Sequence, residues 1–259
     1  MAEKDLIVTK SNELINANYK LTLNEQRLVL IALSKVDSRG QAQREFKVTG
    51  QEFAKFTGLQ EKHAYDALYE AAKKLFSRDL RWTEYEAGEE IEVLLHLTSQ
   101  VKLAKKGEGR VKLRWTEEAM PYITQLQSRF TSYKLKHALS LSSAYAIRIF
   151  EMLMQFKTTK TRTIKLEDIR SMLKVESKYP KFKDFNRWII QPTIKDINQN
   201  TPYIVSFSYS KIGRSVTDLH FDFSENGNFE APEKEMKRAK KVVKEAIERC
   251  KKTIDMFGE

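Results

Sequence analysis

The sequence predicts an α+β fold in which one structural unit occurs twice. The first copy begins near Leu21 with LTLNEQRLVLIAL, and the second begins near Leu141 with LSSAYAIRIFEML. In each copy a hydroxyl residue, Thr22 or Ser142, precedes apolar residues at helical spacing, as expected of an N-cap. A short β-like segment, two further helices and strands rich in Lys and Arg follow. The order helix, strand, helix, helix, β-hairpin is that of a winged helix, so we expect two pseudo-symmetric winged-helix domains in tandem.

In the first copy, Gly58 is a suitable residue to end the second helix, because glycine tolerates the left-handed conformation of a C-cap. The third helix places Ala64, Leu68, Ala71 and Leu75 on one stripe of 3.6-residue period, which predicts a buried face. The expected helices cover about 23–36, 49–57 and 60–76, and the expected strands about 46–48, 80–85, 91–97, 101–103 and 111–115.

In the second copy, Pro192 lies inside the third helix, where it removes one backbone hydrogen bond and predicts a kink. The large side chains of this helix are expected on its buried face, and other aromatic residues are assigned to the core as well. The expected helices cover about 142–156, 167–173 and 181–198, and the expected strands about 163–166, 203–209 and 216–223. The expected core residues include Tyr65, Phe76, Trp82, Phe150, Phe182, Phe185, Trp188 and Ile189.

The segments between and beyond the copies complete the domain organisation. The N-terminal SNELINA predicts a short helix, and the link 117–136 has a mostly helical pattern without glycine. A link of this kind favours two packed domains over two flexibly tethered ones. The composition changes after Phe223 to SENGNFEAPEKE, and a basic helix is expected beyond it. We therefore expect an N-terminal winged helix at 1–128, a C-terminal winged helix at 129–226 and a basic helical tail at 227–259.

The composition favours a reduced, cytoplasmic protein with a polyanionic partner. The formal net charge is +11, which is typical of a nucleic-acid binder. Cys250 is the one cysteine, so an internal disulfide framework and CxxC-type zinc or redox sites are excluded. The longest apolar run, 28–33, is too short to span a membrane, and the N-terminus lacks the apolar core of a signal peptide.

Sequence motifs of enzymes are missing. The chain contains no GxxxxGK[ST] phosphate loop and no GxSxG elbow. The four histidines are scattered, without the histidine pair that a metal-dependent nicking replication enzyme would need. We expect no catalytic residue, no metal and no cofactor.

The third helix of the second copy is the best candidate for reading DNA sequence. Lys183 and Arg187 lie one turn apart on its outward face, and Lys181 and Asn186 flank them. Arginine can make two hydrogen bonds to guanine in the major groove. The stretch 157–187, which includes the first part of this helix, holds ten cations and four acidic residues, a net charge of +6. The turn between the last two strands adds Lys211 and Arg214 as the second wing.

The third helix of the first copy is less suited to DNA, because Asp66 and Glu70 lie on its outward face and acids repel phosphates. Its wing is strongly basic, with six cations and one acid over 100–115, a net charge of +5. The first domain is therefore expected to contact the DNA backbone or a partner subunit. Its candidate backbone contacts are Lys62, His63, Lys73, Lys102, Lys105, Lys106 and Arg110.

Three segments resemble the plasmid replication initiator (Rep) family that acts at iterons, the tandem repeats of theta-type origins. They are VTKSNELINANYKLTLNEQRLVLIAL, FTSYKLKHALSLSSAYAIRIFEML and YPKFKDFNRWIIQPTIKDINQNT, and the resemblance covers roughly residues 5–223. It implies a bacterial protein whose monomers bind iterons to open the origin. It also implies that dimers formed through the first domain repress the gene's own promoter, and that the host initiator and replicative helicase are partners.

Two alternatives remain beside this function. A two-headed winged-helix transcription regulator unconnected with replication would have the same fold and charge. A nicking replication enzyme is the other alternative, although the missing histidine pair argues against it. The sequence predicts a non-enzymatic, sequence-specific DNA-binding initiator.

Overall fold

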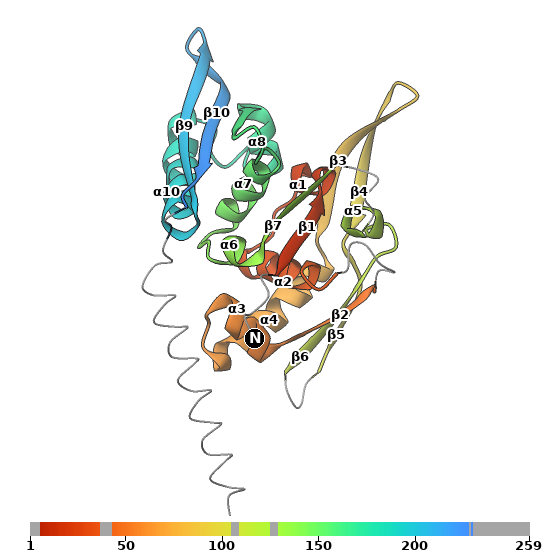
Figure 1. Ribbon diagram of the computed structural model, residues 1–259. Coiled ribbons are helices and arrows are strands. Elements are labelled where there is room, and N and C mark those ends of the chain that lie inside the picture. The colour runs from red at the N-terminus through yellow and green to blue at the C-terminus, as the bar shows by residue number, and fades with distance from the viewer. Residues whose placement is uncertain (1–5, 37–42, 105–108, 125–128, 228, 230–259) are drawn as a thin grey trace, which may run out of the picture.

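The computed structural model describes residues 6–36, 43–104, 109–124, 129–227 and 229. Each half of the chain folds into helices packed on a three-stranded antiparallel sheet (Figure 1). The two sheets have the orders β2-β6-β5 and β8-β10-β9, so in each half the early strand pairs with one strand of a later hairpin. This is the predicted arrangement of two winged helices.

The first half follows the predicted order of elements closely. Thr22 caps α2 with a capping box: its hydroxyl accepts from the Glu25 amide, and the Glu25 carboxylate accepts from the Thr22 amide. Gly58 ends α3 in the left-handed conformation, with φ of 66°. The elements are α2 (Leu23–Leu33), β2 (Glu45–Thr49), α3 (Gly50–Thr57), α4 (Glu61–Phe76), β3 (Asp79–Glu86), β4 (Glu89–His96), β5 (Thr98–Leu103) and β6 (Arg110–Trp115).

Gly109, which directly precedes β6 at the loop end of the β5–β6 hairpin, allows the backbone to approach α4 closely. Its φ is +55°, and a Cβ at this position would lie 2.3 Å from the Tyr65 ring. The hydroxyls of Tyr65 and Tyr69 both donate to the Ala104 carbonyl, Tyr65 at 2.8 Å. The wing is thus attached to α4 through two tyrosines, and only glycine leaves room for one of them.

Replacing Gly109 by alanine is expected to lower the free energy of unfolding by about 1–3 kcal/mol more than the same change at Gly213, since overpacking adds to backbone strain. Gly213 is a matched control, because its φ is also positive, at +60°, but nothing lies within 4 Å of an added Cβ. Urea denaturation followed by circular dichroism measures both. Equal losses would contradict the close packing of Tyr65 on the wing.

In the second half, the N-cap of the first helix lies one residue later than predicted. Ser143, and not Ser142, is the N-cap of α7, because its hydroxyl accepts from the Ala146 amide. The Ser142 hydroxyl instead donates to Asp196 at 2.9 Å. The elements are α7 (Ala144–Met154), β8 (Thr161–Lys165), α8 (Leu166–Met172), α9 (Phe182–Phe185), the π-helical turn η1 (Asn186–Ile190), α10 (Gln191–Asn200), β9 (Tyr203–Ile212) and β10 (Ser215–Glu225).

The predicted third helix of this half is continuous from α9 to α10, but a π turn interrupts its α-helical spacing. The Gln191 amide donates to the Asn186 carbonyl five residues earlier. Pro192 follows directly at the start of α10. Because proline has no N–H and its ring crowds the preceding turn, a wider turn in front of it relieves both problems. The predicted kink at Pro192 takes the form of this π turn.

The N-terminal segment and the link contain a two-stranded sheet that the sequence did not predict. β1 (Ile7–Ser11) pairs with β7 (Phe130–Lys134), so the expectation of a mostly helical link is wrong over these residues. The link contributes two short helices, α5 (Met120–Thr124) and α6 (Leu135–Leu139), and the SNELINA helix is α1 (Asn12–Asn16). The pairing of β1 with β7 attaches the N-terminal segment to the middle of the chain.

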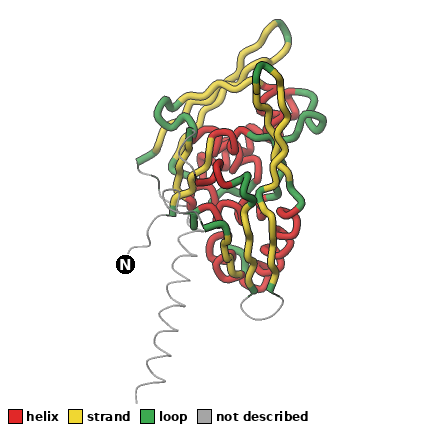
Figure 2. The backbone as a smooth tube through the Cα atoms, turned by 90° about the vertical axis from the view of Figure 1, so that its right-hand side faces the viewer, coloured by secondary structure: helices red, strands yellow, loops and turns green. Residues whose placement is uncertain are grey.

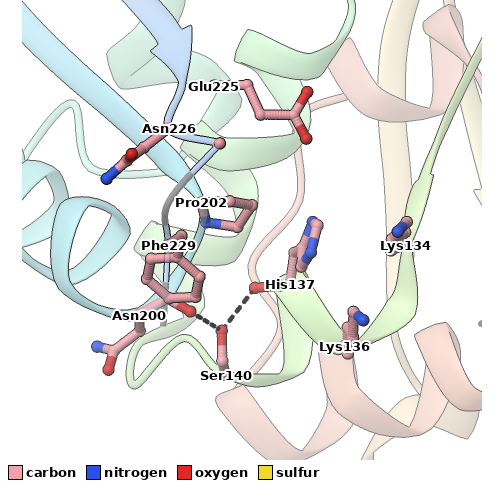
Figure 3. A pocket seen from close by; sticks show the side chains of 10 residues that line it. Lys134, Lys136, His137, Ser140, Asn200, Pro202, Glu225, Asn226 and Phe229 are labelled. Atoms are coloured by element: carbon pink, nitrogen blue, oxygen red, sulfur yellow. Dashed lines mark hydrogen bonds between the residues drawn. The ribbon is translucent and has the colours of Figure 1, made fainter. Parts of the chain in front are cut away.

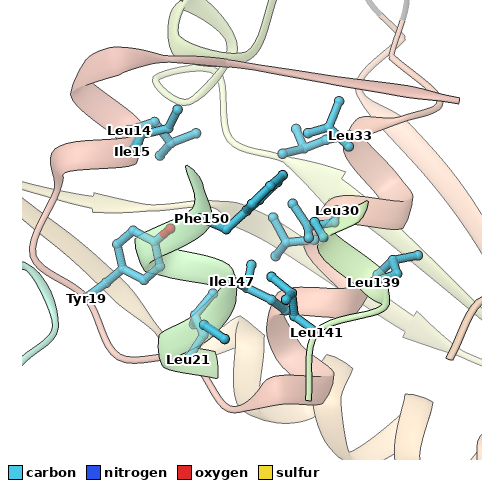
Figure 4. Packing of buried hydrophobic residues seen from close by; sticks show 14 of the residues in the cluster. Leu14, Ile15, Tyr19, Leu21, Leu30, Leu33, Leu139, Leu141, Ile147 and Phe150 are labelled. Carbon is cyan, nitrogen blue, oxygen red and sulfur yellow. The ribbon is translucent and has the colours of Figure 1, made fainter. Parts of the chain in front are cut away.

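The buried apolar residues form one continuous cluster across both halves. Figure 4 shows Leu14 and Ile15 of α1, Leu30 of α2 and Phe150 of α7 packed side by side. Two aromatic residues assigned to the core are instead exposed, Trp188 by 57% and Phe76 by 50%. Trp188 lies in the π turn, and Phe76 is the last residue of α4, so each is at a position where the regular helical stripe is lost.

Candidate nucleic-acid interface

The end of the second half brings the third helix and the wing together through aromatic rings. The Phe182 ring lies 4.9 Å from the Tyr209 ring of β9. The Lys211 ammonium lies over the same Tyr209 ring, 5.5 Å from its centre. Because Lys181 and Lys183 flank Phe182 and are both exposed, three of the predicted DNA contacts occur around one aromatic pair.

The outward face of the third helix continues along η1 and α10. Lys183, Arg187, Gln191 and Lys195 are exposed at intervals of four residues, and Phe185 and Ile189 are buried on the opposite face. The side chain of Asn186, which is half-buried, accepts a hydrogen bond of 3.3 Å from the side-chain amide of Gln191. This face presents cations and amides, which are donors suited to base edges. Gln191 was predicted on this outward face together with Lys183 and Arg187. Lys195 was not predicted there, although the spacing of four residues indicates it, and Trp188 was predicted to lie in the core.

The wing of the second half is a long ribbon whose tip carries only positive charge. β9 and β10 extend past the strand β8, and Gly213 and Arg214 form the turn between them. Lys211 and Arg214 are exposed, and no acidic residue occurs over 203–217. A register shift between Val216 and Asp218 marks a β-bulge near the tip, which increases the local twist.

The net charge of +6 over 157–187 is only partly available to a ligand. Arg162 is buried; it donates to the Met152 carbonyl and to Gln155 at 2.9 Å. Burial, together with the nearby guanidinium of Arg148, lowers the pKa of Arg162 to about 10. Arg170 donates to the Pro180 carbonyl at 3.1 Å and packs over the Phe185 ring. These two arginines stabilise the fold, and the exposed cations of the helix and wing remain as the candidate contacts.

The outward face of α4 has the mixed charge that the sequence analysis expected. Lys62 and His63 are exposed at its first turn, and Asp66 and Glu70 are exposed further along. Lys73 forms a salt bridge of 3.0 Å with Glu70, and both side chains are more than half exposed. α4 therefore differs from the helix of the second half, where Arg187 stacks on Trp188 and, within the described residues, forms no salt bridge with a carboxylate.

Three lysines form a row across the outer face of the first sheet. Lys112 of β6 lies opposite Lys47 of β2 on one side and opposite Lys102 of β5 on the other. All three are exposed, and like charges placed directly opposite one another destabilise a sheet. Arg110 lies at the end of the same face, where β6 begins. An anionic ligand such as a phosphate backbone would offset this repulsion.

Lys112 was counted in the positive charge of the first wing but not predicted as a contact, and Lys47 was not predicted at all, although the alternation in EFKVT and RVKLRW indicates that both face solvent. The predicted contacts Lys105 and Lys106 lie outside the described residues. Lys102 and Arg110 lie on the basic face of the sheet, as expected. The two wings project from opposite ends of the described molecule (Figures 1 and 2). A ligand that contacts both wings must therefore be long.

A cavity of about 600 Å³ lies where α6 meets the ends of α10 and β10 (Figure 3). The Ser140 hydroxyl donates to the carbonyls of His137 and Asn200, at 2.9 and 2.7 Å.

Within the described residues, no group of three or more His, Cys, Asp or Glu side chains could hold a metal ion. In the same part of the chain, no helix is long and apolar enough to cross a bilayer. The residues that line the cavity beside α6 are Lys134, Lys136, His137, Ser140, Asn200, Pro202, Glu225, Asn226, Gly227 and Phe229.

Comparison with known proteins agrees with this architecture. Residues 7–154 match the family described as "Initiator Replication protein, WH1", and residues 165–223 match "Initiator Rep protein, WH2". A replication initiation protein of Escherichia coli is 29% identical over 228 residues, which cover 84% of this chain and 69% of that protein. The PI protein of Escherichia coli is 25% identical over 248 residues, covering 82% of this chain and 80% of that protein.

A solved structure has the same fold. The crystal structure of the Pi initiator protein in complex with iteron DNA superposes with a TM-score of 0.73 at 23% identity. The superposition covers 88% of this chain and 100% of that chain. Since the two family matches cover both winged helices and most of the sequence, the chain belongs to the family of plasmid replication initiator (Rep) proteins.

Proposed function

We propose that this initiator binds tandem repeats at its origin, with the second winged helix reading the sequence and the first holding the DNA backbone. The observation that carries the proposal is the exposed face of α9, η1 and α10. This face displays Lys183, Asn186 and Arg187 beside a wing that carries Lys211 and Arg214. A helix of this kind can enter the major groove, where each base pair presents a distinct pattern of donors and acceptors.

The relatives support this proposal. The solved neighbour with the same fold is a Pi initiator protein in complex with iteron DNA. Two winged helices on adjacent turns of the duplex would cover roughly 20 bp, or about two helical turns. We therefore expect direct repeats of about that length in the DNA that flanks the gene.

A gel-shift titration with the gene's own flanking DNA tests the function. The protein should bind a repeat at least about 1,000-fold more tightly than a scrambled duplex of equal length, the lower end for specific binding proteins. The same affinity for both duplexes would contradict a sequence-reading function. A fragment that carries the gene and its flanks should also replicate autonomously, which distinguishes an initiator from a transcription regulator.

The row of lysines on the first sheet provides a test of backbone contact. Replacing Lys102 and Lys112 by alanine should weaken binding to repeat and random duplexes alike. It should also reduce the slope of log affinity against log salt concentration by about 2, because two phosphate contacts are lost. Lys20 is a suitable control, since it is exposed and lies outside both wings. An unchanged slope in the double variant would show that this sheet does not contact DNA.

The remaining parts of the proposal concern partners and chemistry. We propose that dimers form through the first domain and repress the gene's own promoter, and that the host initiator and replicative helicase are recruited at the origin. Sedimentation of the protein with one repeat and with an inverted repeat distinguishes monomer from dimer binding.

We also propose that the chain has no nicking activity. Incubation of a supercoiled origin plasmid with the protein and a divalent metal should give no relaxed product.

A further inference from the structure

Trp188 is exposed in the middle of the helix that we expect to read DNA. Its exposed fraction is 57%, and it lies beside Arg187, whose guanidinium is 5.0 Å from the centre of the indole ring. The other two tryptophans are held by the fold: Trp115 is fully buried, and Trp82 packs edge-on against the Tyr122 ring. Covering this indole in a complex would remove apolar area from water, which is favourable.

Trp188 lies within the π turn and is exposed. Phe185, Ile189 and Ile190 are buried around it, so the core side of the turn is filled without the indole. Arg187 and Trp188, two consecutive residues, are both exposed. It also brings Asn186 and Gln191 together across five positions, where their side-chain amides form a hydrogen bond of 3.3 Å. Single π turns of this kind occur frequently at functional sites.

The resulting surface combines three kinds of base recognition. Arginine suits the O6 and N7 atoms of guanine, and the amide side chains of Asn and Gln suit adenine. The feature of the major groove that neither group can recognise is the C5-methyl group of thymine, which requires an apolar contact. Trp188 is an exposed apolar side chain next to Arg187, in the same turn as the hydrogen-bonded pair Asn186–Gln191.

We propose that Trp188 determines specificity by packing on a thymine methyl group next to the base pair that Arg187 contacts. The inference rests on the proposed function, since it requires that this helix lies in the major groove. The stacking of the guanidinium on the indole gives Trp188 a second effect, because it restricts the positions that Arg187 can adopt.

A thymine-to-deoxyuridine scan of one repeat tests the inference. Each substitution removes one methyl group and leaves base pairing intact. At one thymine, the wild-type protein should lose about fourfold in affinity, the ratio that corresponds to burying one methyl group. For Trp188→Ala, the thymine and deoxyuridine duplexes should bind equally at that position. Trp188→Phe, which keeps an aromatic ring, should retain part of the difference.

Ile204→Ala is the matched control, because Ile204 is 49% exposed in the same half but lies on β9. This variant should keep the full methyl dependence. If Trp188→Ala shows the same deoxyuridine losses as the wild type, Trp188 does not read a methyl group and the inference is wrong, although the repeat-binding function stands. If the wild-type protein does not distinguish the repeat from a scrambled duplex, both the function and the inference are wrong.

Discussion

Replacing Glu151 by alanine is expected to destabilise the protein by about 3–5 kcal/mol, because the change leaves a buried ammonium group without a counter-charge. The side chains of Glu151 and Lys10 are 1% and 4% exposed, and they form a salt bridge of 2.6 Å. Tyr133 also donates a hydrogen bond to Glu151. Burial raises the pKa of Tyr133 well above its usual value, so the hydroxyl stays protonated and keeps donating.

Urea denaturation followed by circular dichroism measures the effect. The partly exposed pair Lys35–Glu52, at 2.7 Å and with side chains 30% and 27% exposed, is the control, and Glu52→Ala should cost about 1 kcal/mol or less. The double variant Lys10→Met/Glu151→Met should recover much of the stability, since a buried ion pair can often be replaced by apolar side chains. A loss below about 1 kcal/mol for Glu151→Ala would contradict the buried position of this pair.

The same region explains why Glu151 has a large effect. Lys10 belongs to β1, Tyr133 to β7 and Glu151 to α7, so one carboxylate connects the N-terminal strand to two elements in the middle of the chain. Beside them, Arg148 donates to the Tyr19 hydroxyl at 2.5 Å and to the Ala17 carbonyl at 2.7 Å. Loss of the carboxylate is therefore expected to loosen the N-terminal segment from the centre of the fold.

Local signals were enough to predict the repeated helices. The cap at Thr22, the stop at Gly58 and the buried stripe from Ala64 to Leu75 all depend on residues within a few positions of one another. The sheet of β1 and β7 depends instead on a pairing such as Thr9 with Ser132, which are 123 residues apart. Nothing in either short segment specifies its partner, so this sheet could not be predicted from the sequence.

The candidate site was predicted only in part, because some of its residues are placed by local helical spacing and others by features of the folded chain. Lys183 and Arg187 were identified from their spacing on an ideal helix. Trp188 lies in a π turn, whose spacing departs from the ideal α-helix on which its core assignment was based. The lysine row on the first sheet required the register between strands, which places Lys112 opposite both Lys47 and Lys102.

Replacing Arg187 by alanine is expected to reduce affinity for the repeat by about 1–3 kcal/mol, the value of one good contact to a base. Arg187 is exposed on the π turn and is held over the Trp188 ring, so its removal affects the surface and not the core. Affinity for random duplex should fall much less, since only one positive charge is lost. Gel shifts on both duplexes at one salt concentration measure the difference.

Arg187→Lys separates recognition of a base from attraction to phosphate. Lysine keeps the positive charge but cannot form the paired hydrogen bonds of a guanidinium. This variant should therefore bind random duplex like the wild type and still lose most of its preference for the repeat. Lys183→Ala, one turn earlier on the same exposed face, provides the comparison. If Arg187→Ala weakens binding to both duplexes equally, Arg187 is a phosphate contact, and sequence reading must come from the other side chains of this helix.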